Sequence, residues 1–218
     1  MCQERPKPLN GGAEQAERGH RMESNGRSAA TRSAKVVVAG GFGVGKTSLV
    51  GAVSEIAPLT TEASMTDAAS AVDDARLVGT KTTTTVAMDF GRITIDRSVV
   101  LYVFGTPGQD RFGFMWDDIV AGALGALVLV DTRRIDDCYP AVDYFETRRI
   151  PFVVAVNHWE GAPLADLDEV REALDVDAAV PIVRIDARSP EHARRALVSL
   201  LEYVLTRLRT HAPVAATH

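Results

Sequence analysis

Hydrophobic and polar positions follow one another along the chain in blocks that predict strands and helices in turn. Residues 35–39 form the first apolar, β-branched run and predict a strand. Three later runs, at 124–130, 150–156 and 180–185, are almost continuously hydrophobic, which is typical of parallel strands that are buried on both faces. Because helix-compatible segments separate these runs, the pattern predicts one α/β domain: a mostly parallel sheet of about six strands with helices on both faces.

Two more strands are expected between the first run and the later three. Hydrophobic residues alternate over 85–90 and continue in the opposite phase at Ile93 and Ile95, so we expect a bulge or twist at 91–92. Residues 98–104 form the next strand after a short turn. These two strands are predicted to form a hairpin, with one of them an antiparallel edge strand.

The segment from 57 to 82 is polar and acidic and contains no convincing strand. A helix is expected before it, over 46–56, because Ala57-Pro58 would end that helix. A connection of this length in a compact domain is usually functional or mobile. Part of it, at 62–71, is a candidate for a helix.

Two capping signals mark helices later in the chain. Asp166 is expected to cap a helix whose apolar residues share one face, and Ser189 followed by Pro190 is expected to start the last helix. This last helix carries a long apolar stripe, which predicts core packing. The stripe comprises Ala193, Ala196, Leu197, Leu200, Leu201, Val204, Leu205 and Leu208.

The most informative stretch follows the first strand. Residues 40–47 fit the pattern GxxxxGK[ST] between a strand and a helix, which is the context that a phosphate-binding loop needs. Glycine lets backbone amides wrap around a phosphate, Lys46 would reach the terminal phosphates, and the Thr47 hydroxyl would ligate a magnesium ion. A glycine-rich turn that matches by chance is the alternative. The residues expected to contact a nucleotide here are Phe42, Gly43, Val44, Gly45, Lys46, Thr47 and Ser48.

Composition narrows the class of ligand and the location. The net charge of -5 leaves no basic surplus to neutralise a nucleic-acid backbone, so a single nucleotide is the expected ligand. Cys2 and Cys138 provide neither a disulfide framework nor metal-ligand spacing, which suits a cytoplasmic protein. No stretch has the length of a membrane span. We expect a disordered arm over 1–33, a nucleotide-binding domain over 34–210 and a flexible tail over 211–218.

A second informative stretch, 104–112, follows a buried strand and reads Phe-Gly-Thr-Pro-Gly-Gln-Asp-Arg-Phe. It resembles switch II of Ras-like small GTPases, in which a strand is followed by Asp-x-x-Gly-Gln. The resemblance implies that Gly108 senses the terminal phosphate and that Gln109 orients the attacking water, the main chemical need in phosphoryl transfer. Lys46 and Gln109 are therefore the expected catalytic residues. An ordinary exposed glutamine is the alternative.

The start of the hairpin carries a third signature. Residues 85–90, Thr-Val-Ala-Met-Asp-Phe, resemble the Thr-Ile-Gly-Val-Asp-Phe of many small GTPases. The resemblance makes Thr85 the candidate for a second magnesium-binding hydroxyl beside Thr47. Thr84 is the fallback, because a run of threonines also suits an ordinary strand entry.

The expected base site follows two of the later strands. Residues 157–161, Asn-His-Trp-Glu-Gly, stand where the GTPases have Asn-Lys-x-Asp, and 186–188, Asp-Ala-Arg, resemble their Ser-Ala-Lys loop. A histidine thus replaces the lysine, and glutamate is longer than aspartate, so the strength of the preference for GTP is left open. The residues that this resemblance assigns to guanine are Asn157, His158, Glu160, Ala187 and Arg188.

Two departures from the GTPase pattern concern the phosphate site. Gly105 stands where switch II normally begins with an aspartate that supports magnesium. Either another group, with Asp89 and Asp131 as candidates, completes the metal shell, or magnesium is held weakly. Phe42 stands where the phosphate loop normally has a glycine. A bulky side chain there should hinder water or an arginine from another protein, which predicts slow turnover.

Thr-Pro-Gly-Gln without the aspartate, and Asn-x-aromatic-acidic-Gly at the base site, resemble the bacterial MglA-like GTPases, and most closely the actinobacterial conservon ATP/GTP-binding proteins. The similarity covers about 35–209. It implies a switch that binds GTP and GDP with Mg2+, hydrolyses GTP slowly, and works with a roadblock-type regulatory protein and a sensor-kinase-like membrane protein. Peripheral association with the inner face of the membrane would come through such partners. Two alternatives stay open: a P-loop ATPase or kinase, and a pseudo-GTPase that binds nucleotide without turnover.

Overall fold

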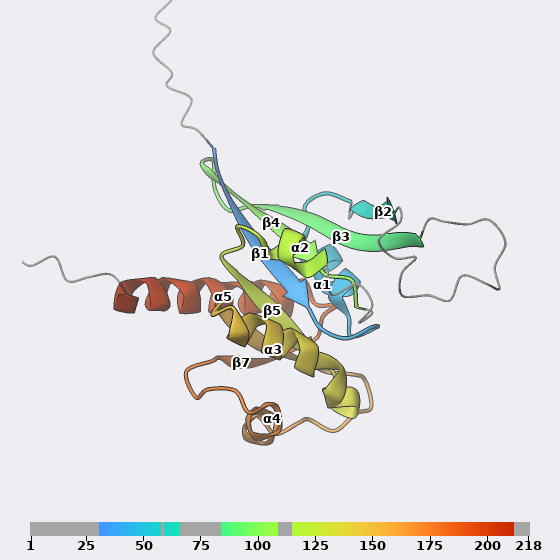
Figure 1. The fold of residues 1–218 in the computed structure, drawn as a ribbon, viewed down its shortest axis with the longest axis vertical. Helices are drawn as coiled ribbons and strands as arrows, with labels where there is room; N and C mark the ends of the chain where they lie inside the picture. Colours follow the sequence, from blue (N-terminus) through green and yellow to red (C-terminus); the bar gives the residue numbers. More distant parts are fainter. Residues whose placement is uncertain (1–30, 58, 66–83, 109–114, 212–218) are drawn as a thin grey trace, which may run out of the picture.

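The computed structural model describes residues 31–57, 59–65, 84–108 and 115–211, and for 59–65 and 84–87 it describes the backbone alone. A sheet runs through the centre of the domain, with helices on both of its faces (Figure 1). The strands are β1 (Arg32–Ala39), β2 (Leu59–Met65), β3 (Thr84–Thr94), β4 (Val99–Gly105), β5 (Gly125–Val130), β6 (Phe152–Asn157) and β7 (Ile182–Ile185). The helices are α1 (Lys46–Val53), α2 (Trp116–Val120), α3 (Tyr139–Thr147), α4 (Leu167–Leu174) and α5 (Pro190–His211), and a 3₁₀ segment, η2, spans Thr132–Cys138.

The described strands form one seven-stranded sheet in the order β2-β3-β4-β1-β5-β6-β7. The strands β4, β1, β5, β6 and β7 are parallel, whereas β2 and β3 pair antiparallel. The carboxyl ends of the five parallel strands therefore share one edge of the sheet. This arrangement confirms the predicted α/β class and the mostly parallel sheet, and β2 is the strand beyond the expected six.

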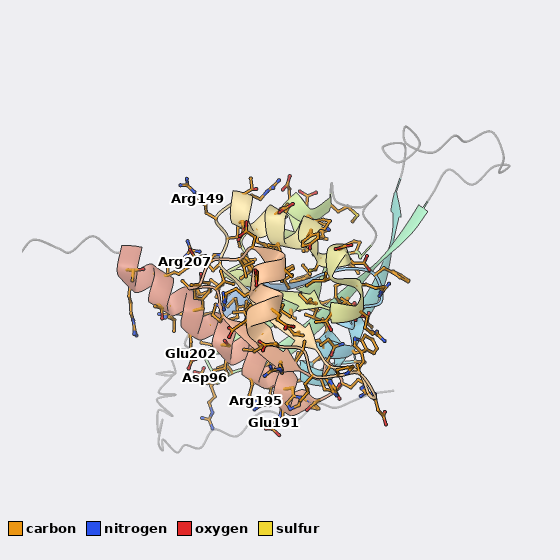
Figure 2. All side chains as sticks on the ribbon, turned by 90° about the horizontal axis from the view of Figure 1, so that it is seen from below. Asp96, Arg149, Glu191, Arg195, Glu202 and Arg207 are labelled. Atoms are coloured by element: carbon orange, nitrogen blue, oxygen red, sulfur yellow. The ribbon has the colours of Figure 1, made fainter. Side chains whose placement is uncertain are left out.

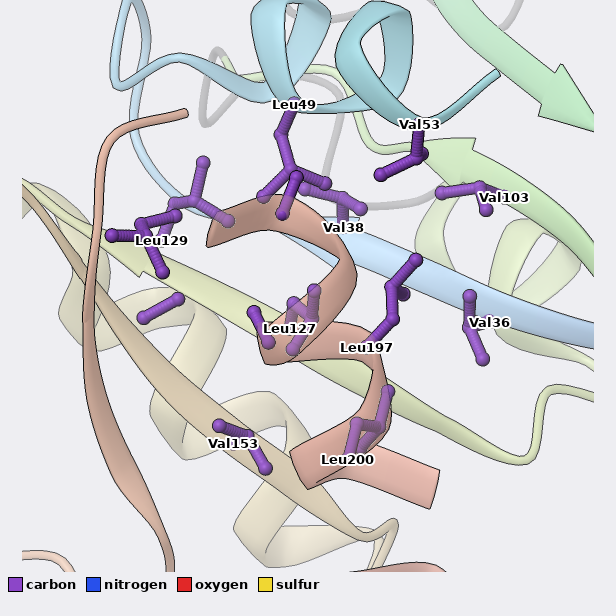
Figure 3. Packing of buried hydrophobic residues seen from close by; sticks show 14 of the residues in the cluster. Val36, Val38, Leu49, Val53, Val103, Leu127, Leu129, Val153, Leu197 and Leu200 are labelled. Atoms are coloured by element: carbon purple, nitrogen blue, oxygen red, sulfur yellow. The ribbon is translucent and has the colours of Figure 1, made fainter. Parts of the chain in front are cut away.

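Each face of the sheet has its own hydrophobic core, because side chains alternate along a strand. Val36 and Val38 of β1 belong to the core that α1 and α5 cover, whereas Val37 and Ala39 belong to the core on the other face, beneath α2 and α3. Figure 3 shows the first core, in which Leu200 of α5 packs over the strands. All residues of β5 and β6 are buried, as their continuous hydrophobic runs predict.

The predicted hairpin of β3 and β4 is confirmed, but neither strand is the expected edge strand, because β2 lies beyond β3. Of the bulge or twist expected at 91–92, the bulge is wrong. The two strands pair in unbroken register. Met88 packs against the core beneath α2 and α3, and Ile93 against the other core, so the change of hydrophobic phase only marks which face of β3 is covered. Gly91 is needed for another reason: a Cβ there would lie 3.0 Å from the Val50 side chain, so glycine lets α1 lie close to the sheet.

The expectation that 57–82 contains no strand is wrong for its first part. β2 pairs with β3 along its whole length and forms the edge of the described sheet. The helix considered for 62–71 therefore does not form at its start, and its remaining residues lie outside the described ones. Threonine suits a strand, but the partner that stabilises this strand is distant in sequence.

The capping signals predicted the starts of helices better than Ala57-Pro58 predicted the end of α1. α1 ends at Val53, three residues before the expected Ile56. The carboxylate of Asp166 caps α4 as predicted, since it accepts a hydrogen bond of 2.8 Å from the backbone N–H of Asp168. The last helix, α5, starts at the predicted Pro190.

The apolar stripe of α5 packs on the sheet only along part of the helix. Leu200 is fully buried, but Leu205 and Leu208 are 52% and 61% exposed. Core packing is therefore a wrong prediction for these two residues, because the end of α5 extends past the strands that the helix covers (Figure 1). Figure 2 shows charged side chains along the exposed side of the same helix, among them Glu191, Arg195 and Glu202.

The ends of the domain add three observations. β1 begins at Arg32, two residues before the expected start of the domain, and the remainder of the expected arm lies outside the described residues. Cys138 is buried beside α3, as expected of a core residue, whereas Cys2 lies outside the described part. None of the helices within the described ranges has the length and apolar character needed to cross a membrane.

Candidate functional site

The loop between β1 and α1 lies at the carboxyl edge of the parallel strands and depends on glycine. Gly40, Gly43 and Gly45 have φ angles of 133°, 72° and 108°, a region that side chains disfavour. A Cβ at Gly40 would also lie 2.4 Å from the carbonyl oxygen of Leu129 in β5. Gly45 precedes the first turn of α1, so the positive end of the helix dipole lies at the loop. This backbone has the form that a phosphate-binding loop requires.

Lys46, the first residue of α1, turns its side chain back into the loop. Its ammonium group donates hydrogen bonds of 2.8 and 2.7 Å to the carbonyl oxygens of Gly40 and Gly41. Burial lowers the pKa of Lys46 to about 8, although the nearby charge of Asp89 opposes the shift. The loop therefore holds a buried cation at its centre, where a terminal phosphate would meet it.

A cavity of about 410 Å³ opens beside this ammonium group. It lies where β1 and β4 end, the position in which open α/β sheets bind their ligands. Three segments form its walls: the glycine-rich loop with the start of α1, one residue of β3, and the residues that follow β4. The lining residues are Phe42, Gly43, Gly45, Lys46, Thr47, Ser48, Asp89, Thr106, Pro107 and Gly108.

Asp89 of β3 provides the carboxylate of this cavity. The Thr47 hydroxyl donates a hydrogen bond of 2.7 Å to its Oδ2. The same carboxylate occupies the space above Gly105 in β4, where a Cβ would lie 3.1 Å from both the Cβ and Oδ2 of Asp89. An acidic group from β3 thus stands in the space that an acidic residue at the end of β4 would otherwise fill.

The other candidate, Asp131, is engaged elsewhere. Its carboxylate accepts hydrogen bonds of 2.8 and 2.7 Å from the guanidinium group of Arg133 and one of 3.0 Å from the backbone N–H of the same residue. The Arg133 side chain accounts for most of the lowering of the pKa of Asp131. Asp131 does not line the cavity. Of the two aspartates that the sequence proposed, the structure brings only Asp89 to Thr47.

Thr106 is a further oxygen donor that the sequence reasoning missed. It is 3% exposed, lines the cavity, and its hydroxyl has no hydrogen-bond partner among the described residues. A buried hydroxyl is normally paired, so this one calls for a ligand or water. The only sequence signal for Thr106 is its place in Thr-Pro-Gly-Gln, and this signal does not indicate that the hydroxyl is buried.

The oxygen atoms of Thr47, Asp89 and Thr106 fit a magnesium ion. Mg2+ prefers oxygen ligands and takes one or two protein groups together with water and phosphate oxygens. Across the described ranges, no group of three His, Cys, Asp or Glu side chains could hold a metal ion alone. A magnesium ion here would therefore depend on the phosphates of a bound nucleotide.

Gly108 lies directly over the glycine-rich loop. A Cβ at this position would lie 2.5 Å from the Lys46 ammonium nitrogen and 2.9 Å from the Cα of Phe42, so only glycine fits. Its neighbour Gln109, the predicted catalytic residue, lies outside the described residues. The backbone of Thr85 belongs to β3, and its side chain lies outside the description, so its predicted role at the metal stays a prediction.

Asn157, at the end of β6, connects the two halves of the site. Its side-chain amide donates a hydrogen bond of 3.0 Å to the carbonyl oxygen of Val44 in the glycine-rich loop. Its side-chain oxygen accepts one of 3.0 Å from the backbone N–H of Ala187, after β7. Asn157 and Ala187 are 5% and 1% exposed. The structure thus brings together three of the predicted site residues across two loops.

The remaining predicted base-site residues lie around this connection. His158 is half-buried and its backbone N–H bonds to Ile185, whereas Glu160 and Arg188 are exposed. Arg188 pairs with Asp186 at 3.0 Å, and this contact, with a smaller effect from the charge of Glu160, raises the pKa of Arg188. The guanidinium group of Arg133 stacks on the ring of Trp159, 4.3 Å from its centroid, next to this loop.

A second residue that the sequence reasoning missed is Arg134 in η2. Its guanidinium group donates a hydrogen bond of 3.0 Å to the carbonyl oxygen of Phe42, at the outer side of the glycine-rich loop. Nothing in the local sequence distinguishes Arg134 from Arg133, because the contact joins residues 92 positions apart. The Phe42 side chain itself is 66% exposed.

A larger hollow of about 730 Å³ lies at the opposite edge of the sheet, between α3 and α5. Its lining includes Ile150 and Phe152, just before and at the start of β6, and Pro181, which directly precedes β7. None of the predicted site residues whose side chains the structure describes lines it. The chemistry of the molecule is therefore concentrated at the glycine-rich loop.

Comparisons with known proteins agree with this fold and with nucleotide binding. A protein-family model described as "Conserved hypothetical ATP binding protein" matches residues 38–211. An uncharacterized protein of Methanocaldococcus jannaschii is 31% identical over 125 residues, which are 56% of this chain and 68% of that protein. The match to the family model includes the glycine-rich loop, and nucleotide binding follows from the family.

Solved structures of similar fold include G domains. The FeoB G-domain from Methanococcus jannaschii has a TM-score of 0.53 and 14% identity, and the match covers 80% of this chain and 99% of that one. The G domain of the T. maritima FeoB iron transporter has a TM-score of 0.55 and 18% identity, covering 79% and 99%. At these identities the likeness concerns the fold, which is that of a P-loop NTPase.

Proposed function

Because the chain belongs to the family described as conserved hypothetical ATP-binding proteins, we propose that this member is a guanine-nucleotide switch that binds GTP and GDP with magnesium and hydrolyses GTP slowly. The observation that carries the proposal is the pair of hydrogen bonds by which Asn157 joins the glycine-rich loop to the loop of Ala187. The second loop is the one whose sequence resembles the guanine-binding loop of small GTPases.

Each residue of the site has a part in binding the phosphates. The backbone of the loop would enclose them, and the ammonium group of Lys46 would exchange the carbonyl oxygens of Gly40 and Gly41 for phosphate oxygens. Thr47, Asp89 and Thr106 would hold magnesium, which when bound neutralises charge on the phosphate oxygens.

Hydrolysis needs a positioned water and little else from the protein. In the proposal, Gln109 orients that water and the backbone of Gly108 follows the presence of the terminal phosphate. Phe42 supports slow turnover, since this residue lines the cavity and carries a bulky, exposed side chain there. Regulatory proteins, of the roadblock and sensor-kinase-like types by resemblance, would read the two nucleotide states.

An ATPase or small-molecule kinase is the second candidate. The description of the family favours it, and so does His158, which replaces the lysine of the GTPase pattern. The third reading, a binding module without turnover, differs only in hydrolysis.

Competition for a fluorescent guanine nucleotide tests the base preference. We expect GTP and GDP to displace labelled GDP at concentrations at least about a hundredfold below ATP, since a site built to bond a polar base edge rejects the wrong one by more than that. Displacement by ATP at similar concentrations would support the ATPase or kinase instead.

Two variants locate the site and separate switch from module. Asn157→Asp places a carboxylate against the Val44 carbonyl and should weaken GDP binding about tenfold or more, because a buried carbonyl without its donor costs about 1–3 kcal/mol. Glu202→Gln, on the exposed side of α5, is the matched control. Phosphate release over hours is then compared between the parent and Gln109→Ala. Absence of release from both would identify a binding module.

A further inference from the structure

Arg134 occupies an interruption in the 3₁₀ segment that follows β5. Its φ and ψ angles of -146° and 58° are not helical, whereas the residues around it form short turns. Its backbone N–H bonds to the carbonyl oxygen of Asp131 at 2.9 Å. The interruption turns the Arg134 side chain toward the glycine-rich loop, and the neighbouring Arg133 turns instead to Asp131 and Trp159.

The guanidinium group of Arg134 has partners that hold it only lightly. It donates to the Phe42 carbonyl oxygen at 3.0 Å, lies 3.3 Å from the Asp137 carboxylate, and lies 3.9 Å from Asp131. Arg133 already satisfies Asp131 at 2.7 Å. The side chains of Arg134 and Asp137 are 49% and 46% exposed, and such ion pairs contribute about 0–1 kcal/mol. A stronger anion nearby would therefore draw the guanidinium group away.

The nearest place for such an anion is the loop itself. A Cβ built on Gly43 would lie 3.9 Å from a guanidinium nitrogen of Arg134, with no nearer atom. Gly43 and Phe42 line the cavity beside Lys46. Across the same loop, a Cβ on Gly41 would lie 2.5 Å from the Cβ of Asp137, so η2 packs directly against it. The backbone of η2 therefore lies against the glycine-rich loop, and the Arg134 side chain lies beside Phe42 and Gly43, two residues that line the cavity.

From this geometry we infer that Arg134 is a catalytic arginine supplied by the chain itself, which leaves Asp137 and contacts the terminal phosphate of the bound nucleoside triphosphate. The inference rests on the proposed nucleotide site. In the reaction, the oxygen of water bonds to the γ-phosphorus while the bond from that phosphorus to the β–γ bridging oxygen breaks. The bridging oxygen keeps the electron pair and leaves on the diphosphate, and the water proton passes to inorganic phosphate. Arg134 stabilises the negative charge that develops on the leaving and equatorial oxygens.

The position of Phe42 gives this arginine its importance. The phenyl ring of Phe42 is exposed and would hinder an arginine from another protein, whereas the backbone carbonyl oxygen of the same residue accepts a hydrogen bond from Arg134. An internal arginine reaches the phosphates without passing the ring. In the resting state it is engaged with Phe42 and Asp137, which keeps hydrolysis slow.

The test compares Arg134→Ala and Arg134→Lys with Arg209→Ala, which removes an exposed arginine at the far end of α5. Affinities for GDP and for a non-hydrolysable triphosphate are measured first, then phosphate release in a single turnover, then formation of the complex with GDP and aluminium fluoride, which imitates the transferring phosphoryl group. We expect Arg134→Ala to bind GDP within about threefold of the parent, to release phosphate about a hundredfold more slowly, and to lose the aluminium fluoride complex. Arg134→Lys should recover part of the rate, and Arg209→Ala should match the parent.

Asp137→Asn separates catalysis from support of the loop. It removes the resting partner of Arg134 and keeps the shape of the side chain, so we expect turnover at or above the parent rate. Three results would overturn the inference: turnover of Arg134→Ala equal to the parent, equal losses of GDP affinity and of rate in Arg134→Ala, or a parent that binds nucleotide and releases no phosphate over hours. A parent that binds no nucleotide at all would instead refute the proposed function.

Discussion

An aspartate placed at Gly105 would test whether Asp89 has taken over the acidic position of this site. The Cβ of the new residue would lie 3.1 Å from the Cβ and Oδ2 of Asp89, which is only 9% exposed. Two carboxylates about 4 Å apart repel by about 4 kcal/mol at the effective dielectric constant of such sites. Crowding of the new atoms adds about 1–3 kcal/mol. Because Lys46 and solvent relieve part of this, we expect Gly105→Asp to destabilise the ligand-free protein by about 2–4 kcal/mol.

Two companion variants separate charge from crowding. Gly105→Ala has the same Cβ without the carboxylate. Its free energy of unfolding should be at least about 1 kcal/mol higher than that of Gly105→Asp. Gly105→Asp combined with Asp89→Ala removes both the repulsion and the contact. The double variant should be at least about 2 kcal/mol more stable than the sum of its single changes predicts.

Urea unfolding at low ionic strength, followed by tryptophan fluorescence, measures these free energies. Repeating it at lower pH should shrink the penalty of Gly105→Asp, because protonating one carboxylate removes the repulsion. A functional readout follows: chelation of magnesium should accelerate GDP release from the parent, have little effect on Asp89→Ala, and regain its effect in the double variant. Gly105→Asp as stable as the parent, or a double variant with additive changes, would refute the reasoning.

Three further predictions concern other parts of the molecule. The pKa of Lys46 is about 8 without ligand, and a bound phosphate favours its charged form, so nucleotide affinity should fall about fivefold from pH 8 to pH 9. Calorimetry in buffers of different ionisation enthalpy should show that binding takes up a proton. An affinity that does not change with pH would contradict this prediction. Phe42→Gly should release phosphate about tenfold or more faster in a single turnover with unchanged GDP affinity, and a rate no faster than the parent would exclude steric hindrance by the ring. Leu208→Gln should change the free energy of unfolding by less than about 0.5 kcal/mol, whereas Leu200→Ala, at a fully buried position of the same helix, should lower it by about 2–5 kcal/mol; equal losses would show that the end of α5 is covered in solution.

The elements that sequence predicted well are those whose signals are local. Continuous hydrophobic runs identified β5 and β6 because both faces of these strands are buried. The glycine spacing of 40–47 identified the loop because the backbone angles themselves require glycine. The buried hydrophobic run before Asn157 also placed this residue correctly at the end of β6, while its role at the base stays a prediction.

The elements that were missed depend on partners distant in the chain. β2 is recognisable only through its pairing with β3. The end of α5 is exposed because the helix continues beyond the last strand that it covers. The choice between Asp89 and Asp131 could not be made from spacing, since it depends on which carboxylate the folded strands bring to Thr47. No sequence signal pointed to Arg134, because Arg133 next to it is the same residue type and yet its side chain contacts Asp131 instead of the glycine-rich loop.

The single side chain of Asn157 has a consequence for how fast a nucleotide could leave. One amide group latches the glycine-rich loop to the loop that is proposed to contact the base, through Val44 on one side and Ala187 on the other. Breaking either hydrogen bond would free one side of Asn157 and so remove part of what holds the other loop. A protein that accelerates nucleotide exchange would have no need to reach the buried phosphates: pulling on the exposed Arg188, one residue beyond the latch, would loosen both loops.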